Sequence, residues 1–337
     1  MDWSGRMQGF HQIIGHESII EHLQKAIERG KVSHAYLFHG EEGSGKQTLA
    51  KAFAKTLQCQ EGGRTSCNRC ISCMQADSNN HPDILWVTHE KASISIDDIR
   101  NQVNGDIHIK PYSSPYKIYI IDSAEKLTEQ AQNALLKTME EPPEYAVILL
   151  LVNNINLILS TILSRSVLLN LRAVDKQVIK EYLMVQHHVP DYMARIAADF
   201  SGGNVGKAIK YASSEEFERM KDEILHILKY INDMELNEII SGLKAITANK
   251  TSIDDYFDLI LLWYRDILML KATKDPNLLL YKEEYQFIRK QASISSYDQI
   301  ENIIKSIEKA KIRLKANVNL DIALELMLLT IKENSNG

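Results

Sequence analysis

The sequence predicts an α/β domain followed by all-helical segments. Up to residue 171, short apolar runs that are typical of buried strands alternate with segments whose apolar residues recur at helical spacing. From Arg172 onward only the helical spacing remains. Strands that alternate with helices indicate a mostly parallel sheet covered on both faces. The predicted divisions are an α/β domain over 1–171, a small helical domain over 172–213 and a larger helical domain over 214–337.

Each predicted element depends on a short stretch of sequence. The strands are five apolar runs: Ala35–His39, Ile84–Val87, Lys117–Ile121, Ala146–Val152 and Val167–Leu171. The helices of the first 213 residues are expected at Lys46–Leu57, from Ser95 through Val103, from Glu129 to Met139, and at Val174–Val185, Tyr192–Phe200 and Val205–Ala212. Ser95 and Asp98 have the spacing of a capping box, and Pro142-Pro143 would end the third of these helices.

Composition sets limits on the class of protein. The chain has 337 residues, of which 45% are hydrophobic and 25% charged, so it is an ordinary globular chain with room for two or three domains. A net charge of -5 argues against a free-standing DNA-binding protein, which usually carries a large basic face. The N-terminus does not resemble a signal peptide, and the longest apolar run is too short to span a bilayer. We therefore expect a cytoplasmic protein with reduced thiols.

A glycine-rich loop stands between the first predicted strand and the next helix. Gly40, Gly43, Ser44, Gly45 and Lys46 lie in a stretch that fits the pattern G-x-x-x-x-G-K. In such a loop, backbone N–H groups surround phosphate oxygens and the helix N-terminus adds positive potential, while the lysine reaches the β and γ phosphates. The alternative is a chance glycine-rich turn. We expect the loop to bind ATP or ADP with magnesium.

Two positions that would hold the magnesium ion are in question. The residue after the loop lysine is normally Ser or Thr, whose hydroxyl coordinates Mg²⁺, but here it is Gln47. Thr48 comes one residue late, and one residue on a helix is a rotation of about 100°. Asp122 ends the strand Lys117–Ile121 and is suited to holding a metal, although it could instead be a strand-end cap. We expect binding to be retained more readily than hydrolysis.

The four cysteines of the chain lie close together in sequence. They follow the spacing C-x7-C-x2-C-x2-C at Cys59, Cys67, Cys70 and Cys73. Four thiolates at this spacing, in a reducing compartment, can surround one tetrahedral zinc ion. Gly62-Gly63 and Asn68-Arg69 supply the tight turns that such a knuckle requires. Four unliganded cysteines are the rival interpretation, and redox catalysis would favour an isolated C-x-x-C. The sequence thus predicts a zinc knuckle over 59–73.

Three stretches carry a resemblance to a known family. They are Ser33–Phe38, Asn133–Pro143 and Thr161–Ser166. Together they resemble the clamp-loader subunits of the bacterial DNA polymerase III holoenzyme over about the first 210 residues; beyond that point the chain is similar only in length and character. The resemblance implies an AAA+ P-loop domain, a helical lid and a helical collar for oligomerisation. It also implies gamma/tau and delta subunits as partners in a five-membered ring that opens the sliding clamp and places it on primed DNA.

Within this family the chain looks like the chiefly structural subunit and not the motor. Motor subunits keep Thr or Ser after the loop lysine, Glu after the strand-end Asp, and an Arg in the lid. This chain has Gln47, Ser123 and Gly206 at those positions. Two alternatives stay open: an active gamma/tau-like ATPase, and a zinc-dependent nucleic-acid-binding module that would bind DNA tightly by itself.

The resemblance also implies roles for two further residues. Asn153 occupies the sensor position that reads the γ-phosphate, unless it simply starts a turn. Arg165, in Ser164-Arg165-Ser166, matches the family's Ser-Arg-Cys motif, in which the arginine projects into the ATP site of the neighbouring subunit. Such an arginine finger acts in trans, whereas an unrelated surface arginine would be salt-bridged or solvated.

Overall fold

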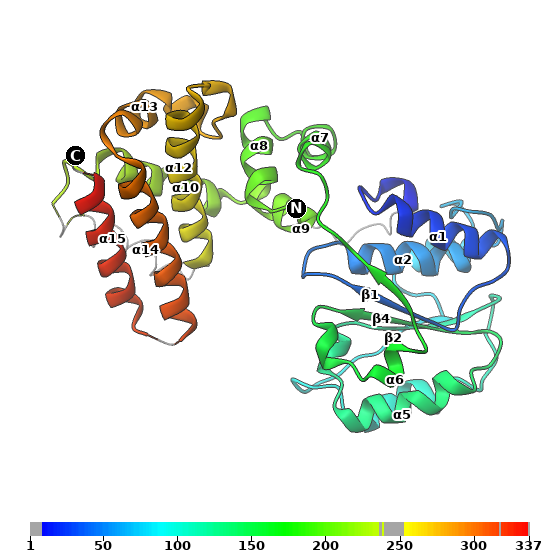
Figure 1. The fold of residues 1–337 in the computed structure, drawn as a ribbon. Helices are drawn as coiled ribbons and strands as arrows, with labels where there is room; N and C mark the ends of the chain where they lie inside the picture. Colours follow the sequence, from blue (N-terminus) through cyan, green and yellow to red (C-terminus); the bar gives the residue numbers. More distant parts are fainter. Residues whose placement is uncertain (1–8, 236–237, 239–252, 317, 336–337) are drawn as a thin grey trace. The chain divides into compact units, whose positions relative to one another are not determined.

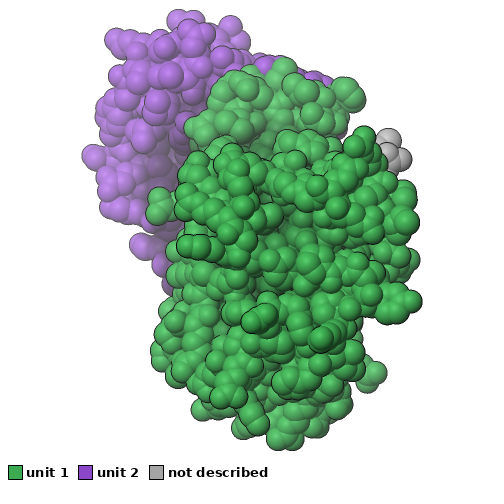
Figure 2. Space-filling view, turned by 90° about the vertical axis from the view of Figure 1, so that its right-hand side faces the viewer, with its two compact units in different colours: residues 1–188, 201–208 green, residues 189–200, 209–337 purple. Residues whose placement is uncertain are grey.

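The chain forms two compact units. The structure is a computed structural model that describes residues 9–235, 238, 253–316 and 318–335. Unit 1 comprises residues 1–188 and 201–208, and unit 2 comprises residues 189–200 and 209–337 (Figures 1 and 2). In the described ranges, no helix is both long enough and apolar enough to cross a bilayer.

Unit 1 is built on a five-stranded parallel sheet with the order β2-β3-β4-β1-β5. The strands are β1 (Ala35–His39), β2 (Ile84–Trp86), β3 (Lys117–Ile121), β4 (Ala146–Val152) and β5 (Val167–Asn170). All five predicted strands are confirmed, with β2 and β5 each one residue shorter than expected. Because the strands are parallel, all of their carboxyl ends meet at one edge of the sheet, and all of their amino ends at the other.

The two faces of the sheet carry separate cores. Alternate residues of a strand point to opposite faces, so Tyr36 and Phe38 pack with α1 (Glu17–Glu28) and α2 (Lys46–Leu57). Leu37 points the other way and packs with the layer that contains α5 (Glu129–Glu140). Figure 1 shows these helices on opposite sides of the sheet. The predicted sheet covered on both faces is therefore confirmed.

The remaining helices of unit 1 are short, apart from α7. They are α3 (Ile71–Asp77), α4 (Ile96–Ile99), α6 (Ser160–Leu163) and α7 (Lys176–His187), with 3-10 turns η1 (Phe10–Gln12), η3 (Ala124–Lys126) and η4 (Ile155–Leu157). The predicted capping box is confirmed, since Ser95 and Asp98 each cap the other's backbone N–H at the start of α4. The predicted α-helix does not continue through Val103, because the chain changes to a π-helical segment, η2 (Arg100–Asn104).

Unit 2 is helical throughout its described part, as expected. Its elements are α8 (Asp191–Phe200), α10 (Glu215–Tyr230), α12 (Ile253–Thr273), η5 (Pro276–Leu278), η6 (Lys282–Glu284), α13 (Tyr285–Ile294), α14 (Tyr297–Lys315) and α15 (Leu320–Ser335). Buried hydrogen bonds join three of these helices: the Trp263 indole N–H donates to Gln291 Oε1 at 2.8 Å, and Gln291 Nε2 donates to the Leu228 carbonyl at 2.7 Å. Residues 236–237 and 239–252 of the predicted helical segment lie outside the described residues.

The segment predicted as a separate lid is divided between the two units. Residues 172–188 and 201–208 belong to unit 1, whereas 189–200 and 209–213 belong to unit 2, so the boundary passes through α9 (Val205–Ser213). The three predicted helices of this segment are present, with ends shifted by up to two residues. The division into an α/β domain, a lid and a collar stays a prediction.

Candidate nucleotide and metal sites

The glycine-rich loop connects β1 to α2 at the carboxyl edge of the sheet, as the motif requires. Gly43 has φ +82° and Gly45 has φ +96°, left-handed conformations that glycine adopts without steric cost. The Gly40 N–H donates to the Val152 carbonyl at the end of β4, which fixes the start of the loop. α2 begins at Lys46, directly after the loop. The strand–loop–helix arrangement therefore places the loop N–H groups at a helix N-terminus.

The ammonium group of Lys46 is already fully bonded. The side chain is only 7% exposed, and Nζ donates to the carbonyls of Gly40 and Glu41, each at 2.7 Å. Its third bond goes to Asn153 Oδ1 at 2.8 Å. An ammonium has three protons, so these three acceptors match its capacity. Burial lowers the pKa of Lys46, and the nearby carboxylates of Glu125 and Asp122 oppose that shift.

Gln47 and Asp122, from segments far apart in sequence, meet at this edge. Gln47 Nε2 donates to Asp122 Oδ2 at 2.6 Å, and the other carboxylate oxygen accepts the Ser123 N–H at 2.9 Å. An ionised carboxylate accepts hydrogen bonds but cannot donate them, so the amide nitrogen of Gln47 has to face it. Thr48 is exposed on the next position of α2. The residues at the two positions that would hold the magnesium ion are thus in direct contact with each other.

Asn153 connects Lys46 to Glu125. The Asn153 N–H and its Nδ2 donate to the two carboxylate oxygens of Glu125 at 3.1 and 2.6 Å, while its Oδ1 accepts from Lys46. Asn153 lies just after β4, where a sensor residue was expected, and four of the expected nucleotide residues converge here: Lys46, Gln47, Asp122 and Asn153. Their polar atoms, however, are bonded to one another.

The first turn of α9 lies against the loop. The Gly206 N–H donates to the Gly43 carbonyl at 2.9 Å, and Asn204 Nδ2 donates to the Glu42 carbonyl at 2.7 Å. A Cβ atom added at Gly206 would lie 2.7 Å from the Gly43 oxygen, closer than real Cβ contacts come. The position where motor relatives are expected to carry an arginine is therefore a close backbone contact.

A cavity of about 520 Å³ lies beside the loop. It is lined by residues 15–19 and by Asn170 with residues 172–175 and 178. His16, in its wall, is bonded through Nε2 to the Ser44 carbonyl at 3.1 Å, which connects the cavity wall to the loop. Cavities of about 300–1,000 Å³ are typical of small-molecule sites, so this one has room for a nucleoside.

Arg165 is placed away from all of these residues. It lies two residues before β5, whose Val167 pairs with Tyr36 near the start of β1, so it lies at the amino edge of the sheet, opposite the loop. Its guanidinium donates to the Thr161 carbonyl at 3.1 Å and pairs with Glu140 at 2.7 Å. Side chains of both Arg165 and Glu140 are at least one-third exposed. Arg165 therefore cannot serve the loop of its own chain.

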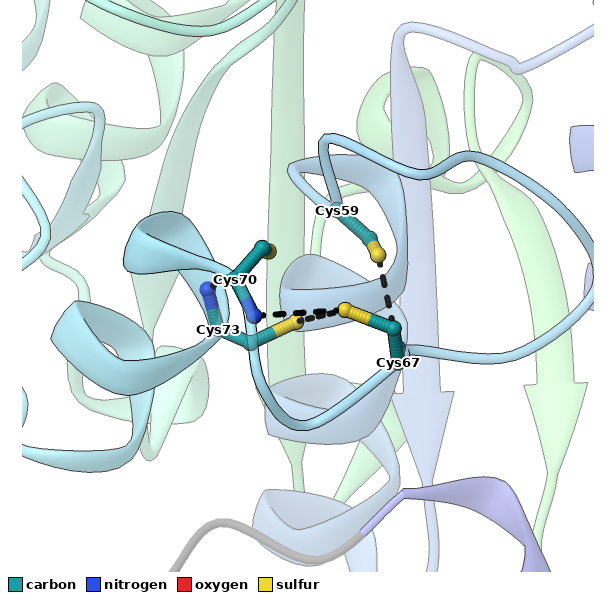
Figure 3. A group of neighbouring side chains, drawn as sticks. All are labelled: Cys59, Cys67, Cys70 and Cys73. Carbon is teal, nitrogen blue, oxygen red and sulfur yellow. Dashed lines mark hydrogen bonds between the residues drawn. The ribbon is translucent and has the colours of Figure 1, made fainter.

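The four cysteines converge, as the sequence predicted. Their sulfur atoms all lie within 4.8 Å of one another, and Cys67 Sγ is 4.0 Å from Cys73 Sγ (Figure 3). Zinc–sulfur bonds of about 2.3 Å in a tetrahedron give sulfur–sulfur distances of about 3.8 Å, so the spacing fits one zinc ion. The predicted turns are present, with left-handed backbone at Gly62, Gly63 and Asn68.

Backbone N–H groups support the sulfur atoms. The N–H groups of Cys67, Cys70 and Cys73 point to the sulfur atoms of Cys59, Cys67 and Cys70, each at 3.4 Å. The Arg69 backbone N–H makes the largest contribution to a lowered pKa of Cys67, about 7, whereas burial raises the pKa of Cys73. Hydrogen bonds to sulfur favour the thiolate form, which is the form that binds a metal. The cluster could therefore bind zinc.

Sequence reasoning missed a polar network beside the cluster. The His81 ring bonds through Nε2 to Ser72 Oγ at 2.9 Å and accepts the Asp83 N–H at Nδ1. The three residue types suggest a catalytic triad, but a nitrogen that accepts a backbone N–H leaves the proton on Nε2, so His81 cannot be a base for Ser72. The Asp83 carboxylate accepts the N–H groups of Tyr112 and Ser113. The network is therefore structural. The stretch of sequence that could have indicated it is His81-Pro82-Asp83 before β2.

The fold and the loop define the class of this protein. A parallel sheet of this order, with a P-loop after β1 and polar residues at the carboxyl ends of β3 and β4, is an AAA+ type P-loop domain. Residues 15–175 match the family model described as "DNA polymerase III, delta subunit". The chain is 30% identical over 318 residues to DNA polymerase III subunit delta' of Bacillus subtilis (strain 168), covering 94% of this chain and 95% of that protein. It belongs to the delta' family of DNA polymerase III clamp-loader subunits.

Other relatives are gamma and tau subunits. Identity is 26% over 351 residues with DNA polymerase III subunit gamma of Buchnera aphidicola subsp. Baizongia pistaciae, covering 96% of this chain and 94% of that protein. Subunit tau/gamma of Haemophilus influenzae is 34% identical over 189 residues, or 55% of this chain and 27% of that protein. Among solved structures, a gamma subunit-related protein of Thermotoga maritima matches with a TM-score of 0.46 and 22% identity, covering 94% of this chain and 99% of that one.

Proposed function

We propose that this chain is the non-motor, delta'-like subunit of a cytoplasmic clamp loader and that it donates Arg165 to the ATP site of a neighbouring subunit. In this proposal it joins gamma/tau and delta subunits in a five-membered ring that opens the sliding clamp and places it on primed DNA. The observation that carries the proposal is the position of Arg165 at the amino edge of the sheet, opposite the chain's own loop. An arginine there can act only outside its own nucleotide site.

The surroundings of Arg165 suit a group that acts in trans. Its side chain is 37% exposed, and its ion pair with Glu140 is open to solvent. Exposed pairs of this kind are worth about 0–1 kcal/mol, so breaking the pair with Glu140 costs little. A permanently charged guanidinium placed on a transferring phosphoryl group is worth about 10³–10⁵ in rate in GTPases.

The chain's own loop supports a role without efficient hydrolysis. Gln47 lacks the hydroxyl that would coordinate Mg²⁺, and Ser123 stands where an active ATPase has the glutamate that activates water. Gly206 replaces the expected lid arginine. Replacing Gln47→Thr and Ser123→Glu together should raise nucleotide binding without much turnover, because the lid arginine is still missing.

The proposal also includes a zinc ion and separate roles for two helical segments, the lid and the collar. Cys59, Cys67, Cys70 and Cys73 hold one zinc ion, which organises the knuckle. Residues 172–213 serve as the lid, and 214–337 as the collar that contacts other subunits. These assignments are supported by the converging sulfur atoms and by the helical character of the described part of unit 2.

The test is to reconstitute the loader with Arg165→Ala and to compare assembly, DNA- and clamp-stimulated ATP hydrolysis, and clamp loading with the unmodified complex. We expect normal assembly, and a partial loss of hydrolysis and loading because only one of several sites loses its finger. Arg165→Lys keeps the charge but not the planar fork, and should be intermediate. Arg29→Ala, an exposed arginine at the end of α1, is the matched control and should behave as unmodified. If the complex with Arg165→Ala loads clamps at the rate of the unmodified complex, or if it fails to assemble, the proposed role of Arg165 is wrong.

The second candidate is a gamma/tau-like motor, which the intact G-x-x-x-x-G-K loop and the full-length gamma relative favour. It predicts hydrolysis by the isolated chain at about 1 per second or more, the range of working ATPases. Our proposal predicts negligible hydrolysis by the isolated chain. A zinc-dependent DNA-binding module, the third candidate, predicts tight binding of primed DNA by the isolated chain, which a gel-shift assay would detect.

A further inference from the structure

In this chain, the residues at the two magnesium-binding positions of a P-loop protein are hydrogen-bonded to each other. The ion is normally held by the hydroxyl after the loop lysine and by an acidic residue at a strand end. The corresponding residues are Gln47 and Asp122, and Gln47 Nε2 donates to Asp122 Oδ2 at 2.6 Å. The residues at the two positions that would coordinate the ion are therefore bonded directly to each other.

The residues present do not fit magnesium. Mg²⁺ needs oxygen ligands at about 2.0–2.1 Å in near-ideal octahedral geometry, and the end of the Gln47 amide that faces Asp122 is Nε2, which offers no lone pair. The second oxygen of Asp122 accepts the Ser123 N–H at 2.9 Å, so each carboxylate oxygen already accepts one hydrogen bond. Thr48, the nearest hydroxyl on α2, is turned by about 100° from the required position. Binding of the ion would have to break the contact between Gln47 and Asp122.

The phosphate position is closed in a similar way. Each of the three Lys46 protons is bonded to an oxygen of the chain itself, from Gly40, Glu41 and Asn153. Asn153 is held in turn by Glu125. The Lys46 ammonium is thus satisfied within the chain, and a phosphate must compete with these contacts while facing the carboxylates of Glu125 and Asp122. Without Mg²⁺ there is no divalent charge to offset that repulsion.

We infer that Gln47 takes the place of the magnesium ion, so that this loop excludes the metal, and that any nucleotide at the loop is bound as the free anion and not as a magnesium complex. Gln47 is in this sense a specificity residue: its amide satisfies Asp122, which in a motor subunit would hold the ion. This inference concerns the chain's own loop and would stand even if Arg165 had no role in a neighbouring site.

The test measures ADP binding to the isolated full-length chain by calorimetry, with Mg²⁺ and in buffer freed of divalent ions by a chelating resin. No soluble chelator is used, because one could also remove zinc from the cysteine cluster. Gln47→Thr restores the expected hydroxyl. The matched control is Gln130→Thr, because Gln130 is also the second residue of a twelve-residue helix and is exposed on α5.

For the unmodified chain and Gln130→Thr, we expect ADP affinity to be equal with and without Mg²⁺; undetectable binding in both buffers agrees equally well. For Gln47→Thr, Mg²⁺ should raise ADP affinity by about 10- to 100-fold, the range over which residues that support a metal usually act. If Gln47→Thr melts early or loses zinc, Gln47→Ser replaces it.

Two results would overturn the inference. One is ADP affinity of the unmodified chain that increases about tenfold or more with Mg²⁺, because the loop would then accept the metal. The other is a folded Gln47→Thr or Gln47→Ser chain whose ADP binding stays insensitive to Mg²⁺ or undetectable, since Gln47 would not be the residue that excludes the ion. Neither result bears on Arg165, which is tested in the assembled loader.

Discussion

The cysteine cluster and the P-loop lie in the same unit, and each is recognisable from a short motif, but they differ in what their polar atoms contact. The four sulfur atoms face one another and receive backbone N–H groups, which leaves a complete donor set for a cation. In the P-loop, Lys46 and Gln47 are bonded to acceptors of the chain itself. A motif thus indicates which residues converge, whereas contacts from distant segments decide whether a ligand can use them.

The largest expected effect is loss of the metal from the cysteine cluster. Cys70→Ser should lower the zinc content from about one ion per chain to near zero, because a structural zinc site loses most of its affinity with one thiolate. Structural zinc contributes on the order of 10 kcal/mol to small folded modules, so α3 should unfold locally. Metal analysis and hydrogen exchange over 59–77 measure both results.

Met74→Ser is the control for that substitution, since Met74 is exposed on α3, the helix that Cys70 caps. It should keep zinc and protection. If the Cys70→Ser chain kept its zinc and its protection from hydrogen exchange, the contrast between the two sites would be wrong. The cysteine cluster, like the P-loop, would then not need a ligand to stay folded.

The next effect concerns the contact between α9 and the loop. Gly→Ala at a helical position usually stabilises a protein by about 0.4–1 kcal/mol. At Gly206 we expect the opposite sign, a loss of about 1–3 kcal/mol, because the added Cβ would lie 2.7 Å from the Gly43 oxygen. Thermal unfolding, with hydrogen exchange at residues 201–208, would show the change.

Lys207→Ala is the matched control, because it removes only the long ion pair with Glu41. Its effect should stay within about 0.5 kcal/mol. Stabilisation by Gly206→Ala would mean that the loop and α9 are free to separate, and the P-loop would be more open than described.

A smaller effect is expected from the loop lysine. Lys46→Met keeps the apolar length of the side chain but leaves the Gly40 carbonyl and Asn153 Oδ1 without the Lys46 donor, and the Glu41 carbonyl with only the Ser44 N–H. We expect a loss of about 1–3 kcal/mol in the free energy of unfolding, measured by urea denaturation. Clamp loading by a reconstituted complex should be nearly unchanged, unlike the effect of losing this lysine in a motor.

Lys31→Met, at an exposed position before β1, is the comparison and should be neutral. If Lys46→Met abolished loading while folding stayed intact, the lysine would be serving a nucleotide, and the P-loop would resemble the cysteine cluster in having a ligand.

The smallest expected effect is on pH dependence. Burial lowers the pKa of His81 below its ordinary value of about 6.5. The unfolded chain therefore binds a proton at a higher pH than the folded chain, so His81 reduces stability as pH falls below about 6.5. Denaturation series at several pH values should show a shallower acid slope for His81→Asn, which cannot titrate. An unchanged slope would show that His81 does not contribute.

The sequence was most informative where the signal was local. β1, β3 and β4 were predicted to the residue, because apolar runs between turns identify buried strands. The capping box of Ser95 and Asp98 was also predicted, since both partners lie within one turn. The prediction missed α1, and also α3, a seven-residue helix capped by Cys70 whose residues were interpreted as metal ligands and turns.

The rest depended on contacts between distant residues. Gln47 and Asp122 are 75 positions apart, and their hydrogen bond requires the register of the sheet. The close approach of Gly206 to Gly43 is invisible in sequence, where Gly206 shows only the absence of an arginine. The change from α to π geometry at Arg100 was also not predicted. The spacing of apolar residues does not distinguish the i, i+4 hydrogen bonds of an α-helix from the i, i+5 hydrogen bonds of a short π-helical segment.

The attachment of α3 to the sheet has a consequence for how this protein is made in a cell. Ser72 donates to the Gln58 carbonyl, and Gln58 Nε2 donates to the Tyr116 carbonyl just before β3. Under the proposed zinc site, the metal therefore supports the ends of β2 and β3. β2 is a three-residue edge strand, and a poorly supported edge is a template for aggregation. During synthesis in zinc-poor medium, the yield of soluble chain should fall before any activity is affected.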